Sequence, residues 1–211
     1  MIPEENSLQA DEKIRRINIY VGYGWHKNKT VRNDVFWNSL RTLLEKSAPK
    51  FVDKKPVEVE IHRIRASQAE PLLDGFRRCF KEADVLVFDI ATINPLLELP
   101  PKGKKAQKSF SFSDESYTGF NLNVLFEIGI AIGRDQKPFL FCPNALKSAI
   151  PSDLSGFCLT LYDLKFDGEN VTRVLEDRSG FAAALRRGVK NALQKKYGDS
   201  AATPSSENPA A

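Results

Sequence analysis

The sequence predicts an α/β fold with a doubly wound, mostly parallel five-stranded sheet in the order 2-1-3-4-5 and helices on both faces. Three observations predict it. Short runs of strand-forming residues alternate with segments of helical periodicity, the pattern of strands joined by helical crossovers. Residues 84–90 form a nearly continuous apolar run, as in a central strand covered on both faces. Residues 122–133 are apolar almost throughout, as in a helix buried within a domain.

The first half of the chain supplies two strands and two helices. Residues 17–22 are rich in strand formers and stop at a glycine. Residues 57–64 alternate apolar and polar side chains, which is typical of a strand with one exposed face. The spacing of apolar residues predicts helices at 34–46 and 70–83. The segment 23–30 is then a loop at the carboxyl end of the first strand.

The second half begins with an interval, 93–119, that is too long for an ordinary connection between a strand and a helix, which takes about 2–6 residues. We predict an insertion, disordered or acting as a lid, within a single domain that spans 14–196. Short apolar runs predict strands at 137–142 and 157–162, and helical spacing predicts a final helix at 181–196.

Composition excludes several classes of protein. The chain has 211 residues, of which 42% are hydrophobic and 27% charged, and its net charge of +4 is too small to argue for nucleic acid as a partner. No apolar run approaches the roughly 20 residues that span a membrane, so we expect a cytoplasmic protein without a membrane partner. Three widely spaced cysteines and two histidines argue against a disulfide framework or a metal site. Residues 1–13 are expected to be a flexible N-terminus and 197–211 a disordered tail.

Glu127 is the only charged residue between positions 122 and 133. Burying an isolated carboxylate is costly, so Glu127 needs a partner, a raised pKa or a pocket that opens onto it. A pocket would make Glu127 a candidate catalytic residue. The alternative is a structural glutamate paired with an arginine or with backbone amides.

Asp89 is the second candidate catalytic residue. In doubly wound sheets, ligands bind outside the carboxyl ends of the strands, and Asp89 ends a buried strand at that edge. We therefore expect Asp89 and the loop 23–30 to converge on Glu127. The alternative role for Asp89 is to cap the following loop through backbone amides.

The candidate substrate-binding residues flank the same edge: Gly22, Tyr23, Trp25, Asn121 and Asn123. Tyr23 or Trp25 could stack on a base, although Trp25 could equally cover the surface. Asn121 and Asn123 could cap a helix, and Asn121 could also reach a sugar hydroxyl. The chain contains neither the G-x-G-x-x-G dinucleotide fingerprint nor a G-x-x-x-x-G-K-[ST] loop.

Two runs of the sequence resemble a known superfamily. A-D-V-L-V-F-D-I-A-T-I-N-P at 83–95 and N-L-N-V-L-F-E-I-G-I-A-I-G-R-D-Q-K-P-F-L-F at 121–141 resemble the nucleoside 2-deoxyribosyltransferase-like and TIR-like nucleotide-binding families. The segment I-P-S-D-L-S-G-F-C-L-T-L-Y-D at 150–163 is similar to the TIR-like branch. In this resemblance Glu127 matches the catalytic glutamate, and Asp89 matches the aspartate that ends the third strand. Asn121 stands where the deoxyribosyltransferases often carry an acid, which favours the TIR-like branch.

The resemblance implies an N-glycosidase that hydrolyses or exchanges the base of a nucleoside, a nucleotide or NAD through Glu127. NAD or a nucleotide would then be a substrate, and no cofactor is expected. The resemblance also implies a homo-oligomer and membership of a larger signalling complex, such as one in antiviral defence against phage. The alternative is a TIR-like module that senses a nucleotide or assembles without catalysis.

Overall fold

The computed structural model describes most of the predicted domain, namely residues 14–24, 33–64, 71–93, 96–98, 109–111, 117–154, 156–167 and 170–198. The predicted flexible segment 1–13 lies outside the described residues, as do most of the insertion 93–119 and the tail beyond residue 198.

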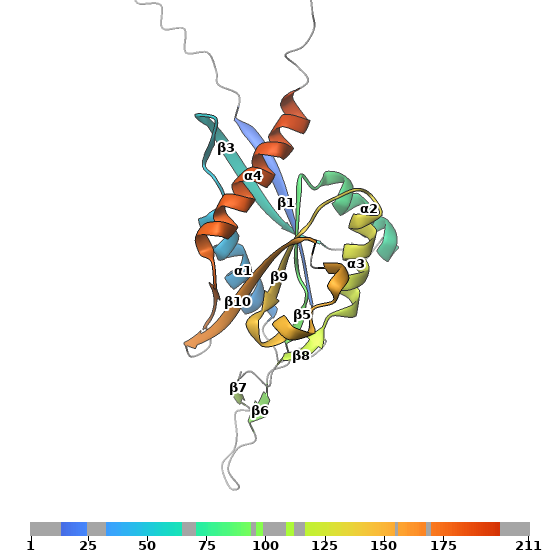
Figure 1. Cartoon of the computed structure of the whole chain (residues 1–211), viewed down its shortest axis with the longest axis vertical. Coiled ribbons are helices and arrows are strands. Elements are labelled where there is room, and N and C mark those ends of the chain that lie inside the picture. The colour runs from blue at the N-terminus through green and yellow to red at the C-terminus, as the bar shows by residue number, and fades with distance from the viewer. Residues whose placement is uncertain are drawn as a thin grey trace, which may run out of the picture.

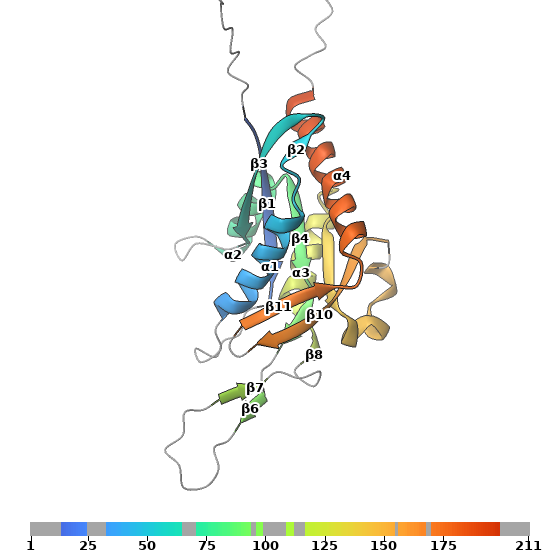
Figure 2. The same ribbon diagram turned by 90° about the vertical axis from the view of Figure 1, so that its left-hand side faces the viewer.

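The main sheet has seven strands in the order β11-β10-β9-β4-β1-β3-β2 and is strongly curled (Figures 1 and 2). The contacts β3–β1, β1–β4, β4–β9 and β9–β10 are parallel, whereas β2–β3 and β10–β11 are antiparallel. The strands are β1 Arg15–Tyr23, β2 Phe51–Val52, β3 Lys55–Arg63, β4 Val85–Asp89, β9 Phe139–Pro143, β10 Cys158–Asp167 and β11 Asn170–Leu175.

The predicted α/β class is confirmed, but the predicted five-stranded sheet in the order 2-1-3-4-5 is wrong. The observed sheet is mixed, because a short antiparallel strand has been added at each edge. β2 turns into β3 through Asp53 and Lys54, which have φ values of 50° and 64°. Hairpin turns with left-handed residues usually contain Asn-Gly or Asp-Gly in the sequence. This turn contains neither, so the sequence did not predict it. β10 runs past its predicted end at residue 162 and folds back as β11.

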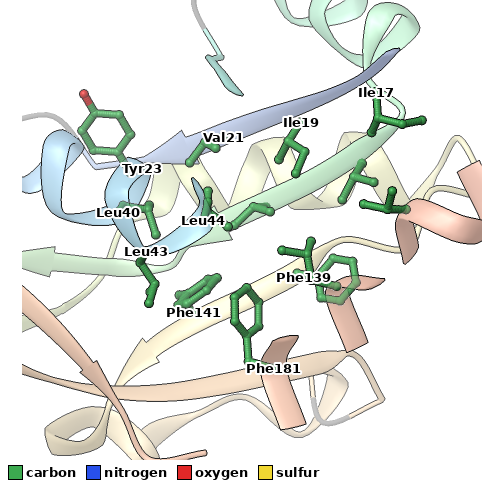
Figure 3. Close-up of a cluster of buried hydrophobic side chains, with 14 of the residues drawn as sticks. Ile17, Ile19, Val21, Tyr23, Leu40, Leu43, Leu44, Phe139, Phe141 and Phe181 are labelled. Atoms are coloured by element: carbon green, nitrogen blue, oxygen red, sulfur yellow. The ribbon is translucent and has the colours of Figure 1, made fainter. Parts of the chain in front are cut away.

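Helices cover both faces of the sheet (Figure 1). On one face, α1 (Asn33–Ser47) and α4 (Arg178–Tyr197) bury apolar side chains with β1, β4 and β9. Figure 3 shows this cluster. On the other face, α2 (Leu72–Glu82) and α3 (Leu122–Ile132) pack with Tyr20, Phe88 and Leu140. Successive side chains of a strand point to opposite faces of the sheet, so each central strand contributes side chains to both clusters.

Two small antiparallel sheets lie between β4 and α3 in the chain. β5 (Ala91–Ile93) pairs with β8 (Tyr117–Phe120), and β6 (Leu96–Glu98) pairs with β7 (Ser109–Ser111). The β5–β8 pair brings the chain back to the end of β4, where α3 begins. Among the described helices, none is both long and apolar enough to cross a membrane.

Candidate functional site

The start of α3 is fixed at the carboxyl end of β4. Asn121 is the N-cap of α3: its side-chain Oδ1 accepts hydrogen bonds from the backbone N–H groups of Asn123, at 3.1 Å, and Val124, at 3.2 Å. The Asn121 backbone N–H donates to the Ile90 carbonyl at 2.8 Å. Asn121 therefore has the capping role weighed from the sequence, and it ties α3 to the sheet. Asn123 takes part through its backbone, and its side chain is exposed.

Glu127 lies on the buried side of α3, with Val124, Ile128 and Ala131. It is only 8% exposed, and its Oε2 atom has no hydrogen-bond partner among the residues that the structure describes. Burial raises the pKa of this carboxyl from 4.5 to about 8, because the charged form loses its hydration without gaining a partner. Glu127 is therefore protonated at neutral pH in the resting protein.

Gly22 makes room for the Glu127 carboxyl. A Cβ atom on Gly22 would lie 2.6 Å from Glu127 Oε2 and would also collide with the Phe88 ring. Two residues after Gly22, a Cβ atom on Gly24 would lie 2.5 Å from Asn121 Nδ2. The end of β1 and the first turns of α3 thus approach closely only because β1 ends without side chains on this face. Of the predicted site residues, the structure brings together Gly22, Asn121 and Glu127.

The Gly22→Ala substitution is expected to lower the free energy of unfolding by about 1–3 kcal/mol, the usual cost of overpacking a core. The new methyl group must displace either the Phe88 ring or the Glu127 carboxyl. Urea unfolding of the variant measures this cost. Gly156→Ala is the control, because a Cβ there would meet nothing within 4 Å. Equal midpoints for the two variants would contradict the close contact at Gly22.

Asp89 does not converge on Glu127. Phe88 faces the α3 side of the sheet, so its neighbour Asp89 faces the opposite side. There its carboxylate forms an ion pair with Arg173 at 2.7 Å, and the two side chains are 3% and 1% exposed. The Tyr162 hydroxyl donates to the same carboxylate at 3.0 Å. Asp89 is thus held by an arginine and a tyrosine that the sequence analysis did not identify as its partners.

Arg173 is the centre of this buried cluster. Besides its bond to Asp89, its Nη1 donates to the Phe36 carbonyl of α1 at 2.7 Å, and its guanidinium lies 5.2 Å from the centre of the Tyr162 ring. Burial alone would lower the pKa of Arg173, but Asp89 and Tyr162 outweigh burial and raise it. The sequence signal for this residue is an arginine within the alternating strand N-V-T-R-V-L, at a position on the buried face.

Tyr23 also lies on the face opposite Glu127. It belongs to the α1-side cluster in Figure 3 and stacks on Trp37, with ring centroids 5.8 Å apart. The Arg63 guanidinium lies over the Trp37 ring at 4.4 Å. Tyr23 is therefore not placed to stack on a base beside Glu127. Trp25, the other predicted stacking residue, lies outside the described residues.

A groove of about 730 Å³ lies between α1 and β11, on the Arg173 side of the sheet. Glu127 does not line it. Among the described residues, no group of three or more His, Cys, Asp or Glu side chains could hold a metal ion.

No protein-family model matches this chain, and no curated protein matches it.

Proposed function

We propose that this chain cleaves the N-glycosidic bond of a nucleoside, a nucleotide or NAD, with Glu127 as its catalytic residue. The observation that carries the proposal is the buried Glu127 carboxyl, whose Oε2 has no partner within the described part of the chain and which lies against Gly22 at the end of β1. A buried, unpaired acid destabilises a fold, and such groups are enriched at functional sites. The family resemblance of residues 83–95 and 121–141 supports the same reaction.

The reaction needs a carboxylate close to the positive charge that develops on the sugar. As the base leaves, the anomeric carbon of the sugar gains oxocarbenium character, and a carboxylate beneath it stabilises that charge or attacks to form a glycosyl-enzyme intermediate. In a site with little water this attraction is stronger than in solution. Glu127 must give up its proton first, and its raised pKa sets the pH at which it does so.

The proposed role predicts a pH profile. With the pKa of Glu127 at about 8, kcat/KM should rise as the pH approaches 8 and then level off, because only the ionised form acts. Initial rates of base release across the pH range measure it. A profile that instead falls above pH 8 would assign Glu127 to protonating the leaving base.

The Glu127→Gln variant is expected to lose activity by at least about a hundredfold, as is usual when a group that stabilises transition-state charge is removed. Glutamine keeps the shape and removes the charge. Released base, measured by mass spectrometry after incubation with NAD and a panel of nucleosides, reports the loss. Asp74→Asn, an exposed carboxylate on α2, is the matched control and should leave activity unchanged. Full activity in the Glu127 variant would end the proposal.

A nucleotide-sensing module is the second candidate function, and one observation favours it. Asp89 lies on the other face of the sheet, so Glu127 is the one predicted catalytic carboxyl on the α3 side. The Glu127 carboxyl is neutral at pH 7. A neutral carboxyl can donate a hydrogen bond to a bound base or sugar. The same incubation separates the candidates: intact nucleotide that stays bound supports a sensor, and released base supports an enzyme.

A further inference from the structure

The outer face of α3 is uncharged and largely apolar. Leu122 and Phe126 are 79% and 55% exposed, and Gly129 and Gly133 continue the same stripe at helical spacing. Glu127, the only charged residue of this helix, is on the buried side. Exposed apolar side chains gathered on one helix face mark a surface that another protein covers.

Gly129 has no explanation within the described chain, and Gly133 is the C-cap residue that ends α3. A Cβ on Gly129 would meet nothing within 4 Å, and a Cβ on Gly133 would make only ordinary contacts with the helix backbone. Gly133 has φ −61°, a conformation open to any residue. A glycine inside a helix costs about 1 kcal/mol relative to alanine. Close approach of a second backbone is what a glycine at such a position permits.

We propose that two copies of this chain associate through α3, packed antiparallel about a two-fold axis. The axis would pass between the levels of Glu127 and Ile128. Phe126 of one copy then lies level with Gly129 of the other, and Leu122 lies level with Gly133. Every large side chain of the stripe meets a position without a side chain, so the face complements itself, as an isologous interface requires.

The electrostatics of the stripe fit a second copy. On a two-fold axis a charge near the axis meets its own copy and is repelled, and the exposed side of α3 carries none. The antiparallel arrangement also sets the positive N-terminal end of each helix dipole beside the negative C-terminal end of the other. A strongly charged partner would find nothing to pair with on this face. The association does not depend on the proposed reaction, and Glu127→Gln should dimerise as the wild type does.

Sedimentation velocity of the full chain over a range of concentrations tests the association. We expect a monomer–dimer equilibrium, and we expect Phe126→Asp to weaken it by about tenfold or more, because an aromatic anchor at the centre of an interface carries much of its affinity. Leu73→Asp on α2, an exposed apolar residue at 46% outside the stripe, is the control and should dimerise normally. A wild type that stays monomeric, or equal dissociation constants for the two variants, would overturn the proposal.

Gly129→Ala separates the association from a defect in folding. The substitution should raise the unfolding temperature of the dilute monomer, because alanine favours the helix and nothing crowds it. The same substitution should weaken the dimer. Oxidative cross-linking between a Leu122→Cys copy and a Gly133→Cys copy then checks the register. Preferential linking of Leu122→Cys to itself would indicate a parallel pair and reject the arrangement, as would a dimer unaffected by Gly129→Ala.

Discussion

Replacing Arg173 with methionine is expected to lower the free energy of unfolding by about 3–5 kcal/mol, the usual cost of leaving one member of a buried ion pair alone. The Asp89 carboxyl would lose its counter-ion in a layer where it is only 3% exposed, with the Tyr162 hydroxyl as its remaining side-chain donor among the described residues. The Phe36 carbonyl would also lose its bond to Arg173. Urea unfolding at pH 7 measures the loss.

Two further variants show whether the loss comes from the buried charge. Lys190→Met breaks an exposed pair with Asp53, and exposed pairs contribute about 0–1 kcal/mol, so this variant should unfold close to the wild type. The double variant Asp89→Val with Arg173→Met removes both charges and should recover part of the stability. If the double variant had a lower free energy of unfolding than Arg173→Met alone, the ion pair would make a net stabilising contribution to the fold.

Replacing Glu127 with glutamine is expected to stabilise the protein at pH 8. The folded-state pKa of Glu127 is raised from 4.5 to about 8, so between these values the folded protein holds a proton that the unfolded chain releases. Stability therefore falls as the pH rises through this window. At about 1.4 kcal/mol per pKa unit, the loss reaches about 3 kcal/mol at pH 7 and about 5 kcal/mol above pH 8.

The glutamine variant lacks this titration, so its advantage over the wild type should grow from near zero at pH 4 to several kcal/mol at pH 8. Urea unfolding of both proteins at a series of pH values measures the difference. Asp74→Asn again serves as the control and should show no such trend. A constant difference across the range would mean that Glu127 has a partner that keeps it ionised. Because the glutamine variant is the more stable protein at pH 8, unfolding could not explain a loss of activity there.

Local patterns predicted the single elements well. The apolar run at 122–133 places α3 and the burial of Glu127, and Asn121 caps that helix as its position suggested. The helix predicted at 34–46 is observed at Asn33–Ser47. Periodicity within one segment is enough for such assignments, since it reports which side of that segment is apolar.

Side-chain partners and sheet edges could not be predicted in the same way. Asp89 was placed with Glu127 because both lie near the carboxyl ends of strands, but alternation along β4 sends Asp89 to the other face. Its partner Arg173 is 84 positions away. β11 is short and polar in alternation, and only its pairing with β10 makes it a strand. Contacts between distant segments decide these features, and no single segment carries them.

The separation between Asp89 and Arg173 also bears on how the chain folds as it leaves the ribosome. Asp89 emerges 84 residues ahead of its counter-ion. Until β11 is made, the layer beneath α1 contains an aspartate whose arginine has not yet been synthesised. The last strand therefore completes the buried ion pair as well as the sheet, and a nascent chain that stalls before it leaves Asp89 without its counter-ion.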